Sequence, residues 1–217
     1  MTAPRELAEL PFVDLLRPHS GPLERAGVYE TVHFDRRTFD DAEAPNTRFE
    51  ECAFTSLSVT GCGLRRSKFH DVWLRGARVV GSNLAETQWW DAVVLSAAFA
   101  GVEAFSSQWR RVLFSGCKLD SVNFRDATFR DVVFEDCVLR DVDWSGSALR
   151  SVRFPGSALH RARFGKSELA GTDFRGATEL DMADGYTALK GAIIDSGQLV
   201  PIAPMLAAAL GITVKDN

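Results

Sequence analysis

Residues 117–146 read CKLDS-VNFRD-ATFRD-VVFED-CVLRD-VDWSG, and this stretch decides the fold. The third residue of each group of five is large and apolar, and the first is small or β-branched. The row of large residues runs in phase from Tyr29 to Phe174, and only Ala44 and Ala104 in it are small. A single unbroken repeat of this kind predicts one domain.

A period of five fits neither a regular helix nor a flat strand. Residues five apart on an α-helix are rotated by about 500°, which is about 140° away from the same face. On a flat strand, residues at odd spacings point to opposite faces. Every fifth side chain can point inward only if the chain turns a corner about every five residues. The sequence therefore predicts a coil with several short sides.

The number of sides follows from the spacing at which like residues recur. Phe34 and Phe54 are 20 residues apart, and so are Trp89 and Trp109. We therefore predict four sides per coil, about 7–8 coils and a rise of ~4.8 Å per coil, the spacing of paired strands. The rod would be ~35 Å long, and its backbone groups would pair with the coils above and below.

These groups of five resemble the A(D/N)LXX motif of the pentapeptide repeat family. The resemblance extends over residues 29–178 and implies a right-handed quadrilateral β-helix, an all-β solenoid. Many repeats depart from the motif and carry Arg, Glu, Val or Trp where it prefers Asp or Asn. The expected organisation has three parts. These are an N-terminal capping segment (1–28), the repeat (29–178) and a last coil with a C-terminal α-helix (179–217).

The N-terminal segment contains a run of apolar residues from Leu7 to Leu16 that is interrupted at Pro11 and ended by Pro18. We expect a short amphipathic helix or staple. Two roles are open. The segment could be a lid on the exposed first coil, or a flexible arm that grips a partner.

The repeat register fails after Phe174, because Glu179 and Asp184 occupy the next inward positions. It is partly recovered at Leu189 and Ile194.

A terminal helix is expected beyond the repeat, with Asp195 and Gln198 as a capping box and Gly211 as its stop. Pro201 and Pro204 should bend its first turns. The end of the chain is similar to that of gyrase-interacting family members, which implies a homodimer formed through this helix. The helix could instead cap the last coil, or do both. The apolar side chains available to either contact are Leu199, Ile202, Leu206 and Leu210.

All four cysteines fall on the row of small residues: Cys52, Cys62, Cys117 and Cys137. This position calls for a small buried apolar side chain, and a free cysteine meets that need. Stacked parallel side chains do not provide the geometry of a disulfide, and no CxxC spacing supports a zinc site.

Catalytic chemistry finds no support in the sequence. An active site needs titratable groups that converge in a concave site, but the four histidines are widely scattered. We predict that the protein is not an enzyme and has no cofactor or metal. The sequence has no run of 18 apolar residues, and its N-terminus lacks the basic and apolar regions of a secretory signal. We therefore expect no membrane contact and a cytoplasmic location.

The charge pattern bears on the partner. A net charge of −4 and a pI near 5.6 predict no direct nucleic-acid binding. The family resemblance implies binding to a type II topoisomerase, DNA gyrase, through mimicry of duplex DNA. However, residues 29–178 carry 20 Lys and Arg against 20 Asp and Glu, which weakens mimicry by charge along the whole rod. A local acidic surface is predicted at Asp126, Asp131, Glu135, Asp136, Asp141 and Asp143.

A second surface feature is apolar. Apolar residues directly precede the large residue of the repeat on one side of four successive coils, so they are stacked there. Neighbouring apolar residues extend the patch. Exposed apolar patches of this kind usually mark contacts. The stripe could be covered by Leu7–Leu16, or it could bind a partner. Phe105, after the small Ala104, could also be turned inward by a local bulge. The predicted stripe comprises Trp73, Trp90, Val93, Leu95, Leu113 and Val133.

Two functional hypotheses follow. The first, from the resemblance, is a non-enzymatic protein that binds a type II topoisomerase and modulates it or protects it from inhibitors. The alternative is a general protein–protein interaction scaffold that uses the apolar stripe and has no link to topoisomerases.

Overall fold

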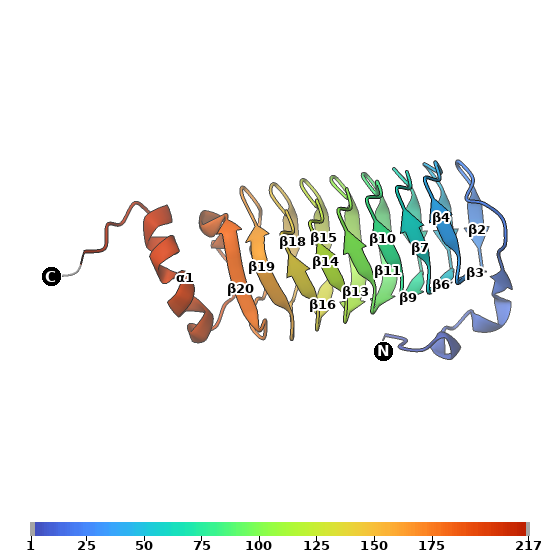
Figure 1. Cartoon of the computed structure of the whole chain (residues 1–217). Coiled ribbons are helices and arrows are strands. Elements are labelled where there is room, and N and C mark those ends of the chain that lie inside the picture. The colour runs from blue at the N-terminus through green and yellow to red at the C-terminus, as the bar shows by residue number, and fades with distance from the viewer. Residues whose placement is uncertain (1–2, 216–217) are drawn as a thin grey trace.

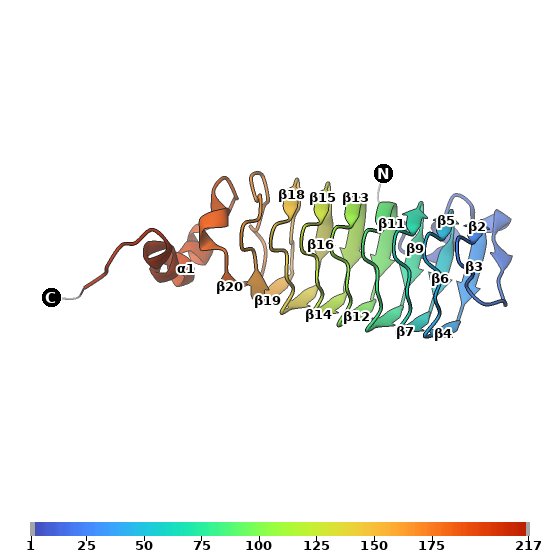
Figure 2. The ribbon, with the colours of Figure 1, turned by 90° about the horizontal axis from the view of Figure 1, so that it is seen from above.

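The computed structural model describes residues 3–215 and shows a rod of stacked four-sided coils. The coils lie one behind another along the rod, with the C-terminal helix at one end (Figures 1 and 2). Residues 3–16, here called the N-terminal arm, run back along the outside of the rod.

Three of the four sides carry ladders of parallel strands, and each side is named here by its first repeat strand. The β2 side contains β2 (Val28–Glu30), β5 (Arg48–Glu50), β8 (Lys68–His70), β15 (Thr128–Arg130) and β18 (Ala148–Arg150). The β3 side contains β1 (Arg17–Pro18), β3 (Val32–Asp35), β6 (Ala53–Thr55), β9 (Trp73–Arg75) and β16 (Val133–Glu135). Two longer strands run through both of these sides, β11 (Gln88–Leu95) and β13 (Gln108–Ser115).

The third side, the β4 side, contains β4 (Thr38–Asp40), β7 (Ser58–Thr60), β10 (Arg78–Val80), β12 (Ala98–Ala100), β14 (Lys118–Asp120), β17 (Val138–Arg140), β19 (Ala158–Arg163) and β20 (Glu179–Asp184). The fourth is held by single bridges such as Glu43 to Gly63. Partners along the repeat are 20 residues apart, as in Phe34 with Phe54. The predicted right-handed quadrilateral β-helix is therefore confirmed.

The interior is filled by columns of stacked side chains. Phe114, Phe134, Phe154 and Phe174 form one column, with ring centroids 4.8, 5.2 and 5.2 Å apart. Each such side chain contributes about 2 kcal/mol by burial, before the entropy of ordering is subtracted. In the row of small residues, buried hydroxyl groups pair with the backbone, because a polar group in the core needs a partner. The Ser147 hydroxyl, for example, donates to the Phe124 carbonyl oxygen at 2.6 Å.

The corners of the coil explain the fifth residue of each group. This residue has positive φ at almost every corner, for example 56° at Asp131 and 66° at Gly156. Asp and Gly tolerate this left-handed backbone conformation better than most residues. The second and fourth residues of each group point outward from the sides between the corners.

Within the N-terminal segment, residues 7–16 do not form a lid on the first coil. The arm contains two short 3-10 helices, η1 (Leu7–Glu9) and η2 (Val13–Leu15), and lies along the β3 side. It joins the rod where β1 pairs with β3. The exposed first coil is covered instead by His19, whose ring packs 5.1 Å from that of Tyr29, and by Leu23.

The last coil contains one extra residue, so the prediction of charged inward positions there is wrong. The pairing of β19 with β20 shifts by one, and Leu180 and Met182 are buried in place of Glu179. Asp184 accepts hydrogen bonds from the backbone of the preceding coil, with its Oδ1 3.0 Å from the Phe164 nitrogen.

The chain then forms a 3-10 helix, η3 (Tyr186–Leu189), and the α-helix α1 (Ser196–Ala209). The predicted capping box is confirmed. The Asp195 carboxylate accepts from the Gln198 nitrogen at 2.9 Å, and the Gln198 amide oxygen accepts from the Asp195 nitrogen at 3.1 Å.

Candidate protein-binding surfaces

The N-terminal arm covers the first half of the predicted apolar stripe. Trp73 is only 1% exposed and Leu95 only 6%, because both pack under Leu10 and Phe12 of the arm. The Trp73 indole also donates to the Pro4 carbonyl oxygen at 3.2 Å. The prediction that Trp73 and Leu95 form an exposed contact surface is therefore wrong. The other possibility was that Leu7–Leu16 cover the stripe, and this cover explains why both residues are buried.

Polar contacts fix the free end of the arm. The Arg5 guanidinium donates to the Ser115 hydroxyl and to the Glu135 carboxylate, both at 2.6 Å. Arg5 holds the pKa of Glu135 below its usual range, with help from the Ser115 hydroxyl. Glu6 forms an ion pair with Arg75. The arm thus places apolar side chains on the sheet and forms ion pairs with Arg75 and Glu135.

A groove of about 780 Å³ lies beside the arm on the same side of the rod. Its floor includes the remaining stripe residues Val93, Leu113 and Val133, which are half-buried. One wall is the arm itself, at Leu10 and Phe12. This groove is the part of the predicted stripe that stays accessible.

The opposite wall is a row of corner residues that sequence reasoning missed. Asp71, Asp91, Arg111 and Asp131 are the corners between the β2 and β3 sides on four successive coils. The Arg111 guanidinium is held by Asp91, with Nε 2.5 Å from Oδ1. Burial, and then the nearby Asp91 charge, raises the pKa of Asp71. The spacing of 20 residues would have revealed this row had the corners been sorted by side.

Trp90 does not belong to the groove. It lies on the β2 side, around the corner, and stacks on His70 with ring centroids 4.5 Å apart. Phe105 is also not turned inward, because Ala104 occupies the inward position and is 1% exposed. The predicted bulge is therefore wrong.

The predicted acidic surface is not one patch. Asp126, Asp131, Asp136 and Asp141 occupy four consecutive corners of one coil, so they are distributed around the rod. Residues five apart in the sequence occupy successive corners, and only residues 20 apart share one.

Arginines also compensate part of this acidity. Asp141 pairs with Arg161 at 2.8 Å, and Asp143 lies 3.9 Å from Arg125, while Glu135 is held by the arm. On the β2 side, three arginines are stacked in register on adjacent coils: Arg110, Arg130 and Arg150. The region of the predicted acidic surface therefore presents mixed charge rather than rows of carboxylates.

The C-terminal helix presents an apolar surface on two faces. Ile202 is 3% exposed and Leu206 is half-buried, so this face packs against the last coil and caps it. Leu199 is 46% exposed and Leu210 72%, so these side chains point away from the rod, as does Val200. Residues 196–214 include no charged side chain. A surface helix that is apolar all round is typical of one that is buried by a further contact.

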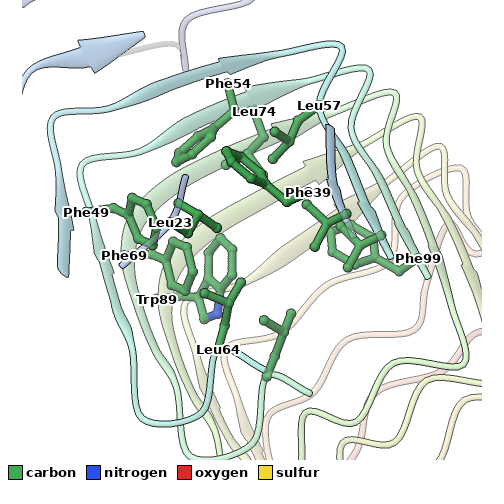
Figure 3. Close-up of a pocket in the computed structure, with 13 residues that line it drawn as sticks. Leu23, Phe39, Phe49, Phe54, Leu57, Leu64, Phe69, Leu74, Trp89 and Phe99 are labelled. Carbon is green, nitrogen blue, oxygen red and sulfur yellow. The ribbon is translucent and has the colours of Figure 1, made fainter. Parts of the chain in front are cut away.

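The interior holds no ligand-sized space among its described residues. A cavity of about 40 Å³ lies near the first coils. Figure 3 shows its lining, which consists only of apolar side chains such as Leu23, Phe49 and Trp89. A space of this size and lining has no polar partners for a water molecule. Across residues 3–215, no cluster of three or more His, Cys, Asp or Glu side chains has the geometry of a metal site.

All four cysteines are buried free thiols on the row of small residues. Burial raises the pKa of the Cys52 thiol to about 11, so it is not poised to react.

Comparison with known proteins agrees with this geometry. Residues 95–174 match the family model described as the pentapeptide repeat region. Over residues 95–174, the repeats of this chain are thus of the pentapeptide type. The resemblance seen in the sequence is thereby confirmed. No curated protein matches this chain in sequence.

A solved structure shares the fold of this chain. A trypsin-treated form of QnrB1, described as a plasmid-mediated fluoroquinolone resistance protein, is 18% identical and superposes with a TM-score of 0.54. The match covers 88% of this chain and 99% of that one. A pentapeptide repeat protein from the thylakoid lumen of Arabidopsis thaliana is also 18% identical, with a TM-score of 0.41 over 48% of this chain and 73% of that one.

Within residues 3–215, α1 and the other helices are too short to cross a bilayer.

Proposed function

We propose that this protein is a non-enzymatic partner of a type II topoisomerase such as DNA gyrase, and that it modulates the enzyme or protects it from inhibitors. The observation that carries the proposal is the shared fold with QnrB1, a fluoroquinolone resistance protein, over 88% of this chain. A topoisomerase partner also implies a cytoplasmic location.

Mimicry of DNA in this proposal is partial and depends on shape. Residues 29–178 have no net charge, and the carboxylates near the middle of the rod are spread around its corners. Long-range attraction of a DNA-binding surface by such a rod is weak, because charges of both signs alternate within a Debye length of about 8 Å. Contact would therefore depend on local complementarity.

A supercoiling assay tests the proposal. Purified protein is titrated into DNA gyrase with relaxed plasmid, with and without a fluoroquinolone. We expect a change in supercoiling or a rescue from the drug as the protein-to-enzyme ratio rises. An unchanged assay at every ratio would contradict the proposal.

The homodimer belongs to the same proposal. The exposed side chains of α1 and the absence of charge over residues 196–214 support self-association through this helix. In a symmetric dimer the same patch meets itself, so one substitution changes both halves of the interface. We expect Val200→Asp, at a side chain that is 73% exposed, to convert dimer to monomer.

Light scattering measures this change, and deletion of residues 196–217 should give the same mass. The matched control is Val138→Asp, at an outward position on the β4 side that is 37% exposed. A wild-type protein that is already monomeric would exclude the dimer.

A second candidate is a general interaction scaffold, which the groove on the β3 side favours. The two functions are separable. A scaffold would bind its partner through Leu113 and Val133 and leave supercoiling unchanged. Substitution of these residues would then abolish partner binding without unfolding the rod.

A further inference from the structure

We propose that the groove on the β3 side binds a short protein segment in which large apolar side chains are flanked by Arg or Lys. The groove comprises the floor Val93, Leu113 and Val133 and the corner row Asp71, Asp91, Arg111 and Asp131. This inference goes beyond the proposed function, because it concerns the chemistry of the bound segment whatever protein carries it.

The N-terminal arm shows which chemistry this side of the rod accepts. It places Leu10 and Phe12 on the apolar surface around Trp73, and it sends Arg5 to the Glu135 carboxylate at 2.6 Å. The arm thus binds the same sheet surface through apolar side chains, and its one arginine binds a carboxylate, although Glu6, Glu9 and Asp14 of the arm are acidic. The second half repeats the apolar surface at Leu113 and Val133, which are half-buried and line the groove beside the end of the arm.

The charge of the groove selects the same chemistry. Asp71, Asp91 and Asp131 line one wall, and Glu9 of the arm is on the other. The single cation among the described lining residues, Arg111, is already held by Asp91 in a two-pronged contact. Carboxylates thus outnumber cations around an apolar floor. An arginine or lysine of a partner would relieve the repulsion between these carboxylates, whereas an acidic segment would add to it.

The length of the groove sets the length of the segment. The corner row extends over four coils, from Asp71 to Asp131. Three steps of ~4.8 Å give ~14 Å, which is the length of about four or five residues in an extended chain. The backbone groups of β11 and β13 are already paired with neighbouring coils, so recognition depends on side chains rather than on strand addition.

Peptide binding to the full-length protein tests the proposal. The probe is a fluorescently labelled peptide of about eight residues that alternates leucine with lysine, and the matched probe has glutamate in place of lysine. Fluorescence anisotropy is recorded at low and physiological salt. We expect the lysine peptide to bind about tenfold or more tightly than the glutamate peptide, and to bind more weakly as salt rises.

Matched variants locate the binding site. Leu113→Asp and Val133→Asp should each abolish binding of the lysine peptide, whereas Val138→Asp, on the β4 side, should leave it unchanged. Asp71→Asn and Asp131→Asn should each weaken binding by up to about fivefold. Asp136→Asn, at a corner that does not line the groove, is the control. Asn tolerates the left-handed corner conformation, so these variants should fold.

Selective binding of the lysine peptide that is lost in Leu113→Asp but kept in Val138→Asp supports the proposal. Equal binding of the two peptides, binding that survives both groove substitutions, or no binding of the lysine peptide would overturn it. If a groove variant loses the circular dichroism of the rod, the Asp71→Asn and Asp131→Asn pair decides the question. None of these results depends on the topoisomerase assay.

Discussion

The two halves of the β3 side differ although the repeat builds them in the same way. Ala53 and Trp73 in the first half occupy the same position of the repeat as Leu113 and Val133 in the second. The first pair is buried and the second is accessible, because Leu10 and Phe12 of the N-terminal arm pack on the first pair only. The repeat determines which residues point outward from the sheet. A segment outside the repeat determines which of these residues meet solvent.

The largest expected difference between the halves is in stability. Trp73→Ala should lower the free energy of unfolding by about 3 kcal/mol, because it removes a fully buried side chain and leaves a cavity under the arm. Urea denaturation measures the loss, and limited proteolysis should show faster cleavage within residues 5–16.

Leu113→Ala is the matched substitution in the open half. It should cost less than about 1 kcal/mol, because the side chain is only half-buried and little contact is lost. Equal losses for the two variants would show that the arm does not distinguish the halves.

A smaller effect is expected where the arm is fixed by charge. Arg5→Ala removes the contacts with Ser115 and Glu135 and should cost about 0.5–1 kcal/mol, since both partners of the ion pair are partly exposed. Faster hydrogen exchange in the arm, with the rod unchanged, is the expected signature. Arg36→Ala, which removes an exposed pair with Asp35, is the control.

The smallest effect is a pH dependence of the arm. Arg5 lowers the pKa of Glu135 from its ordinary value of 4.5, so the carboxylate binds protons more weakly in the folded protein than in the unfolded chain. Its contribution is therefore present above pH 4.5 and is lost as the pH falls through the lower folded value. Amide exchange in the arm, measured relative to the intrinsic rate at each pH, should rise as the pH falls through this window in the wild type, and less so in Glu135→Gln. An equal relative rise in both proteins would exclude this contact as the cause.

The rod could be predicted from the sequence because a period of five requires a corner about every five residues. Phe114 and Phe134 identify the number of sides by their spacing alone, and Asp195 with Gln198 identifies the start of the last helix. Each of these signals is local or periodic, so it is readable without the tertiary structure.

The surface was less predictable for a physical reason. Nothing in the spacing relates Leu10 to Trp73, because the arm packs on the rod through contacts between residues far apart in sequence. The acidic surface failed differently. Asp131 and Asp136 are near each other in the sequence, but a corner of the coil separates them. Sorting the fifth residues by side would have identified the row from Asp71 to Asp131 instead.

Thiol labelling of two introduced cysteines tests most directly whether the arm divides the β3 side. The four native cysteines are buried, so a maleimide should report only on the new thiol. We predict that Leu113→Cys reacts about as fast as the exposed reference Val138→Cys. Leu95→Cys, under the arm, should react at least about tenfold more slowly than Leu113→Cys, and deletion of residues 1–16 should remove this difference in rate. Equal rates for Leu95→Cys and Leu113→Cys in the full-length protein would contradict the account.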